Sequence, residues 1–147
     1  MFTGIRAITD SNKKEVLNLK IAEEQQGFIE PVSLCLAEAE ADTRFVPLAL
    51  YENGEIIGFS MYGKFDEQIW LDRYLIDARF QGKGLGRYFF RALVEYLLER
   101  YPNQPIYLSV FEQNKVAIHL YQKFGFSFTD EIDENGEKIM IYRNGDL

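Results

Sequence analysis

The hydrophobic and polar residues of this chain follow two periods, one typical of strands and one typical of helices. Short runs rich in β-branched and aromatic residues predict strands, whereas apolar residues three or four positions apart predict helices. Seven strands are expected, at residues 5–9, 45–51, 55–64, 68–77, 106–111, 126–132 and 137–142. Four helices are expected, from residue 10 or 11 to about 24, and at 31–39, 84–101 and 114–124. The order β-α-α-β-β-β-α-β-α-β-β predicts an α/β (α+β) fold with a mixed sheet and one strand–helix–strand crossover.

Local signals predict where helices begin and where hairpins turn. Asp10 or Ser11 can cap the first helix, and Pro31 suits the first turn of the second. Asn53-Gly54 and Asn135-Gly136 are two-residue hairpin signals, because both residue types tolerate the left-handed backbone of tight β-turns. We therefore expect an antiparallel hairpin at each of these two positions.

Length and composition are those of one globular domain spanning residues 1–147. Hydrophobic residues make up 47% of the 147 residues and charged residues 27%, which excludes a disordered or collagen-like chain. No apolar run approaches the roughly 18 residues of a membrane span, and the first residues do not resemble a signal peptide. A single cysteine, Cys35, and a single histidine, His119, cannot build a zinc site. We expect a cytoplasmic protein without a metal and without a membrane partner.

The charge of the chain is unevenly distributed. The formal net charge of -7 argues against a nucleic-acid partner. A basic middle, residues 71–124, lies between acidic ends, residues 1–70 and 125–147. This distribution suits an anionic cofactor in one place and a cationic substrate in another. The alternative is that the acidic residues only keep the surface soluble.

A glycine-rich stretch between a predicted strand and a predicted helix is the most informative segment. It reads Gln81-Gly82-Lys83-Gly84-Leu85-Gly86-Arg87. A glycine turn at a helix N-terminus exposes backbone N–H groups that bind phosphate, and Arg79, Lys83 and Arg87 add positive charge. The dinucleotide fingerprint would need a third glycine where Arg87 stands, and the G-x-x-x-x-G-K phosphate loop is absent. The stretch indicates a phosphate-bearing ligand, with a plain tight turn as the alternative.

A second motif follows the next predicted strand. Residues 114–126 read N-x-x-A-x-x-L-Y-x-x-x-G-F, and residues 81–86 read Q-x-x-G-x-G. Together with the element order, the two motifs resemble the GNAT superfamily of N-acetyltransferases over nearly the whole chain. Scattered positions resemble, more narrowly, the small bacterial spermine/spermidine acetyltransferases, among them Leu71-Asp72-Arg73, Tyr107-Leu108-Ser109 and Gly136-Glu137-Lys138.

That resemblance implies a mostly antiparallel seven-stranded sheet flanked by about four helices, with a splay between the fourth and fifth strands that admits acetyl-CoA. Backbone groups on the fourth strand would contact the cofactor at Tyr74, Leu75 and Ile76. Asn114 would bond its pantetheine arm, and Lys123 would reach its phosphates. The residues expected to wrap the pyrophosphate are Gln81, Gly82, Lys83, Gly84, Leu85, Gly86 and Arg87.

Tyr121 falls on the catalytic tyrosine of the family, which protonates the departing CoA thiolate. A phenol of pKa ~10 stays protonated near neutral pH, whereas a leaving thiolate has a pKa of roughly 8.5 by analogy with cysteine. The alternative is a core aromatic residue on an amphipathic helix.

The acceptor amine needs partners of another kind. Its pKa is near ~10.4 by analogy with lysine, so it arrives protonated and must lose a proton before it can attack. The acidic candidates for binding the amine or accepting its proton are Glu23, Glu24, Glu30 and Asp72. For Asp72, the alternative role is an ion pair with Arg73 or Arg79. Some aromatic residues could line the pocket, although residues of this type more often belong to the core: Phe28, Tyr62, Trp70 and Tyr74.

The expected function is therefore direct transfer of an acetyl group from acetyl-CoA to a small cationic amine, with spermine and spermidine as the leading acceptors. One alternative is acetylation of an antibiotic, an amino acid or a protein N-terminus. Others are an acyl-CoA-binding module without turnover and a nucleotide-binding domain. The family often forms homodimers, to which the last hairpin could contribute.

Overall fold

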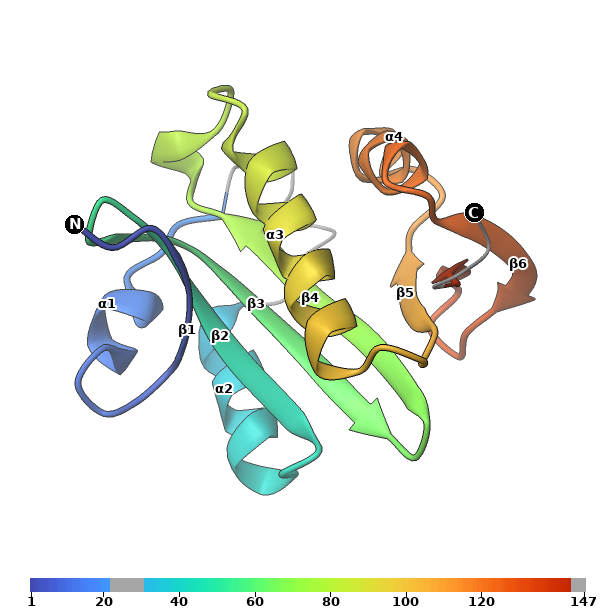
Figure 1. Cartoon of the computed structure of the whole chain (residues 1–147), viewed down its shortest axis with the longest axis horizontal. Helices are drawn as coiled ribbons and strands as arrows, with labels where there is room; N and C mark the ends of the chain where they lie inside the picture. Colours follow the sequence, from blue (N-terminus) through green and yellow to red (C-terminus); the bar gives the residue numbers. More distant parts are fainter. Residues whose placement is uncertain (22–30, 144–147) are drawn as a thin grey trace.

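The computed structural model describes residues 1–21 and 31–143, and Figure 1 shows a twisted sheet with helices on both faces. The strands are β1 (Gly4–Ala7), β2 (Phe45–Glu52), β3 (Glu55–Phe65), β4 (Gln68–Ile76), β5 (Ile106–Val110), β6 (Ser127–Ile132) and β7 (Lys138–Tyr142). The helices are α1 (Lys13–Leu17), α2 (Val32–Ala41), α3 (Leu85–Arg100), α4 (Lys115–Lys123) and the short 3-10 turn η2 (Ala78–Phe80). Within the described ranges, no helix has the length and apolar character needed to cross a membrane.

In the described residues the strands form one seven-stranded sheet, in the order β1-β2-β3-β4-β5-β7-β6. Every neighbouring pair is antiparallel except β4 and β5, which run parallel. Helix α3 connects these two strands, as a parallel pair requires a crossover. The predicted mixed sheet, its element order and its crossover are confirmed.

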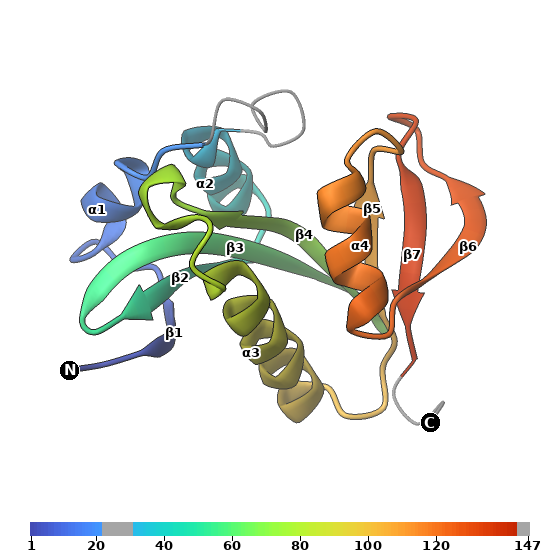
Figure 2. The same ribbon diagram turned by 90° about the horizontal axis from the view of Figure 1, so that it is seen from above.

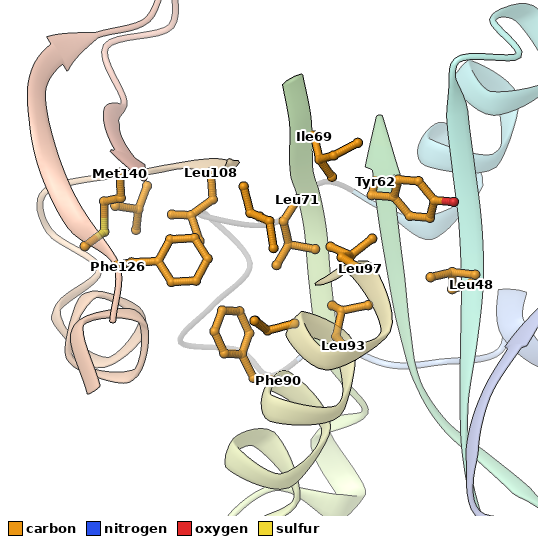
Figure 3. Packing of buried hydrophobic residues seen from close by; sticks show 13 residues of the cluster. Leu48, Tyr62, Ile69, Leu71, Phe90, Leu93, Leu97, Leu108, Phe126 and Met140 are labelled. Carbon is orange, nitrogen blue, oxygen red and sulfur yellow. The ribbon is translucent and has the colours of Figure 1, made fainter. Parts of the chain in front are cut away.

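Apolar side chains cover both faces of the sheet. On one face, α1 and α2 pack against the β2–β4 half, and Figure 2 shows both helices on the same side. On the other face, α3 and α4 pack over β4, β5 and β7. Figure 3 shows Phe90 projecting from α3 toward Phe126. The buried residues of this second cluster include Leu71, Phe90, Leu93, Leu97, Leu108, Phe126 and Met140.

The first helix is shorter than predicted. It ends at Leu17 and not near residue 24, and its N-cap is Asn12, not Asp10 or Ser11. Residues 22–24 of the predicted helix lie outside the described residues. The prediction of a long first helix is therefore wrong for residues 18–21.

Tertiary contacts explain where the first helix begins and ends. The side chain of Asn12 is buried, accepts a hydrogen bond from the Thr9 N–H and donates to the Ala7 carbonyl and the Tyr51 hydroxyl. These bonds tie the helix start to the sheet instead of capping its first turn. After the helix, Lys20 is hydrogen-bonded to the segment that follows β4, which takes the chain out of the helical path.

The two predicted hairpins are both present, but only one has the predicted two-residue turn. Asn53 (φ 50) and Gly54 (φ 82) are both left-handed, and Glu52 pairs with Glu55 across them. In the connection of the second hairpin, Gly136 (φ 82) is left-handed and Asn135 is not. There the carboxylate of Asp133 accepts from the N–H groups of residues 135 and 137, which widens the connection into a longer loop.

Candidate active site

Strands β4 and β5 pair over only two positions and then separate. The parallel register joins Ile69 to Ile106 and Trp70 to Tyr107. Beyond this point β4 continues to Ile76 and β5 to Val110 without pairing. We call the region between residues 71–76 and 108–110 the β4–β5 divergence (Figure 1). The predicted splay between the fourth and fifth strands is confirmed.

A β-bulge lies on β4 at the start of the divergence. The register with β3 joins Tyr62 to Leu71 and Met61 to Arg73, so Asp72 is the extra residue. An extra residue shifts the alternation of the strand by one position. The bulge therefore decides which backbone groups beyond Asp72 face β3 and which face β5.

Two of the three backbone positions predicted to contact the cofactor face the divergence. The Asp77 N–H donates to the Ile57 carbonyl on β3. Because backbone groups alternate along a strand, Leu75 also turns its N–H and C=O toward β3. Tyr74 and Ile76 turn theirs toward β5.

The glycine-rich stretch forms a loop that opens directly into α3. Gly82 (φ 79) and Gly84 (φ 77) are left-handed, and Gly84 is the N-cap of α3. Gly84 offers no side-chain cap, so the first N–H groups of α3 are left for other partners. In the described part of the chain, a Cβ atom added at Gly82, Gly84 or Gly86 would meet no atom within 4 Å. The loop thus leaves open space at a helix N-terminus, where an anion binds favourably.

Two side chains hold the glycine loop against β4. The Gln81 side-chain amide donates to the Ile76 carbonyl over 3.0 Å. The Tyr74 hydroxyl donates to the Gly86 carbonyl in the first turn of α3. Burial raises the pKa of Tyr74 well above its ordinary value, so this phenol remains a donor. Gln81 is therefore a support for the loop as well as a member of the predicted cofactor site.

The buried carboxylate of Asp77 anchors the entrance to the same loop. Its oxygens accept from the Arg79 N–H (2.8 Å), the Arg79 Nε (3.0 Å) and the Lys20 N–H (2.9 Å). Burial opposes ionisation of Asp77, but the hydrogen bonds from Arg79 and Lys20 outweigh it, so its pKa lies below the ordinary value. The positive charge of Arg79 is thus compensated by Asp77. All three predicted basic residues, Arg79, Lys83 and Arg87, are exposed.

Tyr121 lies on α4 among aromatic rings. Its ring centroid is 5.1 Å from that of Phe90 and 6.3 Å from that of Phe126. Burial, followed by the negative charge of Glu137, raises the pKa of Tyr121 to about 12. The hydroxyl therefore stays protonated at neutral pH and can donate a proton. Tyr121 is thus a packed aromatic residue that carries a proton at neutral pH, and packing does not exclude the predicted acid role.

The remaining predicted cofactor residues lie at the two ends of α4. Asn114 is the N-cap, and its Oδ1 accepts from the Ala117 N–H over 3.4 Å. Lys123 is the exposed last residue of the helix. Gly125 (φ 96) follows, and the Phe126 N–H closes the helix end by donating to the Tyr121 carbonyl.

The predicted acceptor residues are only partly within the described chain. Glu23, Glu24, Phe28 and Glu30 lie outside it. Asp72 Oδ2 lies 3.5 Å from Arg73 Nη1, and the same guanidinium reaches Glu38 of α2 at 3.9 Å. The ion pair with Arg73 that was the alternative for Asp72 is therefore present.

Aromatic side chains differ in their fit to an acceptor pocket. Tyr62 is buried, and its hydroxyl lies 3.2 Å from that of Tyr101, so Tyr62 belongs to the core, which was the alternative to a pocket role. Trp70 is partly exposed and stacks on Tyr107, with ring centroids 4.9 Å apart. This pair lies at the last position where β4 and β5 are joined.

Sequence reasoning missed one polar contact beside the divergence. The Ser109 hydroxyl on β5 donates to Glu137 Oε2 over 2.6 Å. The two residues are 28 positions apart, and no spacing rule joins them. Both belong to segments that resemble the polyamine acetyltransferases, which was the one available signal.

Comparison with known proteins agrees with this geometry. The profile of the acetyltransferase (GNAT) family matches residues 13–126. The chain belongs to the GNAT acetyltransferase family. Spermine/spermidine N(1)-acetyltransferase of Bacillus subtilis strain 168 is 44% identical over 149 aligned residues, which cover 96% of this chain and 98% of that protein.

Other members of the GNAT family are more distant relatives of this chain. The [ribosomal protein bS18]-alanine N-acetyltransferase of Haemophilus influenzae is 33% identical, over 73% of this chain and 72% of its own. A spermidine N-acetyltransferase from Vibrio cholerae, solved with CoA and spermine, superposes with a TM-score of 0.76 at 18% identity. That superposition covers 95% of this chain and 94% of the other. At this low identity it supports the fold alone.

The anchor role of Asp77 in this GNAT acetyltransferase predicts a specific pH dependence of stability. We expect Asp77→Asn to lower the free energy of unfolding by about 1 to 3 kcal/mol at pH 7, because buried hydrogen bonds to a charged group are lost. The stabilisation from Asp77 is present above the unfolded pKa of about 3.9 and is lost as the pH falls through the lower folded pKa. Chemical denaturation at pH 7 and below pH 4 should therefore show the difference between the two proteins shrinking with acidity.

Asp42 provides the matched control, because it binds Arg44 through the same Asp-x-Arg arrangement at the surface. Asp42→Asn should destabilise less than Asp77→Asn, since exposed ion pairs contribute little. Equal losses from the two variants would contradict the anchor role of Asp77.

Proposed function

We propose that this GNAT acetyltransferase transfers the acetyl group of acetyl-CoA to a primary amine of spermine or spermidine. The observation that carries the acceptor class is the 44% identity, over nearly the full length of both chains, with the Bacillus subtilis spermine/spermidine N(1)-acetyltransferase. The divergence, the glycine loop and the protonated Tyr121 supply the parts that acetyl transfer needs. A small cationic amine also suits the acidic balance of the chain.

The glycine loop and the divergence are suited to hold acetyl-CoA, which supplies the acetyl group as an activated thioester. The open space beside Gly82, Gly84 and Gly86 lets backbone N–H groups approach the pyrophosphate, with Lys83 and Arg87 adding charge. Tyr74 presents its N–H and C=O to the pantetheine arm and Ile76 its N–H, because the Ile76 carbonyl already accepts from Gln81. Leu75 turns its backbone groups toward β3 and makes no such contact. The further cofactor contacts proposed are Gln81, Leu85, Asn114 and Lys123.

Tyr121 is proposed as the general acid. A negatively charged thiolate is unfavourable in a buried site. A nearby phenol can donate a proton to it as the C–S bond breaks. The raised pKa keeps the proton on Tyr121 until it is needed.

The acceptor is proposed to bind on the side of the divergence where Trp70 and Tyr107 lie. Aromatic faces attract alkylammonium groups, and carboxylates pair with them. The proposed carboxylate contacts of the polyamine are Glu23, Glu24, Glu30 and Asp72. A cytoplasmic location, a homodimer and the lack of metal, nucleic-acid and membrane partners remain predictions from the sequence.

Release of CoA thiol from acetyl-CoA tests the proposed function directly. We expect saturable release with spermine and spermidine, and much less with putrescine, lysine, an aminoglycoside or a peptide with an N-terminal alanine. Release with one of the other amines alone would keep the acetyltransferase and overturn the polyamine acceptor. Tight CoA binding without release for any amine would indicate a binding module.

Replacement of Tyr121 by Phe tests the acid. The variant keeps the ring that packs on Phe90 and loses only the proton donor. We expect kcat to fall about 100-fold or more, with CoA affinity within twofold of the unaltered protein, measured by steady-state kinetics and calorimetry. Unchanged turnover would remove Tyr121 from the acid role.

Two glycines of the loop test how the cofactor is held. Gly84→Ala forces a side chain into a left-handed position at the N-cap of α3, so the N–H groups that face the pyrophosphate should be displaced. We expect CoA affinity to fall about tenfold by calorimetry. Gly86→Ala adds the same methyl group within α3, where φ is not positive, and should change affinity less than threefold. A larger effect at Gly86 would mean that free space and not backbone conformation limits binding.

A further inference from the structure

Glu137 is held by three hydrogen bonds, one to its carboxylate and two to its backbone. The Ser109 hydroxyl donates to its Oε2 over 2.6 Å. The Glu137 N–H donates to Asp133 Oδ1 (2.9 Å), and the Glu137 carbonyl accepts from the Asp133 N–H (2.8 Å). Backbone and side chain are therefore both fixed, as a group that acts on a substrate must be.

Ser109 places this carboxylate on the acceptor side of the sheet. Leu108 and Val110 belong to the core beneath α3 and α4, so Ser109 between them points to the opposite face. Trp70 and Tyr107 point to that same face, since their neighbours in sequence are also part of that core. Ser109 lies on the part of β5 that no longer pairs with β4.

Tyr121 approaches the same place from the opposite face. It packs with the α3 and α4 core, yet the negative charge of Glu137 adds to burial in raising its pKa. Tyr121 lies on α4, which follows β5, and Glu137 precedes β7, which pairs with β5, so both residues belong to segments joined to the strand that carries Ser109. One group can give a proton and the other can take one.

The charge of Glu137 is also less compensated than those of neighbouring acids. Asp72 is paired with Arg73, Asp77 with Arg79 and Glu112 with Lys138. Among the described residues, no cation lies within ion-pair distance of Glu137, whose side-chain partner is the neutral hydroxyl of Ser109. Its charge is available to a cationic ligand.

We propose that Glu137, positioned by Ser109, binds the ammonium group of the acceptor and accepts the protons that its nitrogen loses during acetyl transfer. The proposal rests on the proposed function and names a catalytic carboxylate within the same site. Ser109 is a positioning residue.

The protons and bonds balance as follows. The ammonium gives one proton to Glu137, which passes it to solvent, and the free nitrogen forms the C–N bond to the acetyl carbon. The C–S bond breaks, sulfur keeps the electron pair and takes the proton of Tyr121. Glu137 accepts the second nitrogen proton and passes it to solvent, from which Tyr121 is reprotonated. One proton is released overall, with the N-acetylamine and CoA.

The test compares Glu137→Gln with Glu112→Gln, which removes an exposed carboxylate in the turn after β5 that pairs with Lys138, the residue after Glu137. At pH 7 we expect Glu137→Gln to lower kcat for spermidine about 100-fold and Glu112→Gln to change it less than threefold. The deficit of Glu137→Gln should shrink as the pH rises toward 10, because more of the amine then arrives unprotonated. CoA affinity should stay within twofold in both variants.

Two further comparisons separate chemistry from folding. Formate should partly restore activity to Glu137→Ala, because a small carboxylate can enter the vacated space. Ser109→Ala should lose about tenfold in kcat and Ser109→Thr, which keeps the hydroxyl, should recover most of it. An unchanged kcat and pH profile in Glu137→Gln would overturn the proposal. A rise in KM with kcat and the pH profile unchanged would overturn the role of Glu137 as the proton acceptor.

The proposed function and this inference can fail separately. If the unaltered protein acetylates spermidine and Glu137→Gln matches it, only the inference is overturned. If the unaltered protein acetylates a different amine alone, the polyamine acceptor is overturned, and the same variants assayed with that amine still decide the role of Glu137.

Discussion

The site is built around the packing of Phe90 between the two halves of the sheet. This fully buried ring projects from α3, and its centroid lies 5.4 Å from that of Tyr74 on β4 and 5.1 Å from that of Tyr121 on α4. It also lies 5.7 Å from Phe124 and 5.8 Å from Phe126. Where β4 and β5 stop sharing hydrogen bonds, these aromatic contacts hold the two halves together. Figure 3 shows Phe90 and Phe126 of this group. The same packing sets the position of Tyr121.

The bulge at Asp72 complements this packing at the level of the backbone. Without the extra residue, the backbone N–H and C=O groups of Arg73 and Leu75 would face the divergence. With the extra residue, the backbone groups of Tyr74 and Ile76 face it instead. The Tyr74 hydroxyl also reaches the start of α3. One added residue thus aligns the cofactor-facing backbone of β4 with the glycine loop that follows it.

The sequence predicts this architecture well wherever a local rule applies. Alternation and helical spacing locate nearly every element, and Asn53-Gly54 specifies its turn. The predicted length of the first helix is wrong because Asn12 forms hydrogen bonds with Ala7 and Tyr51. In addition, the Lys20 N–H is hydrogen-bonded to Asp77, 57 positions away. Propensity cannot anticipate such long-range contacts. For the same reason the motifs indicate Tyr121 and the glycine loop, whereas Ser109 and Glu137 come together only through the pairing of β5 with β7.

The carboxylates of this site can be sorted by the partner that each one has. Asp77 and Asp72 each form an ion pair with an arginine, which compensates their negative charge within the protein. Glu137 is oriented by a hydroxyl and a backbone loop, which fix its geometry while leaving its charge for a ligand. Its charge also favours the protonated form of Tyr121, whereas a neutral phenol cannot cancel the charge of Glu137. Placing a carboxylate on the other side of the divergence therefore favours the protonated phenol, as the proposed acid role of Tyr121 requires.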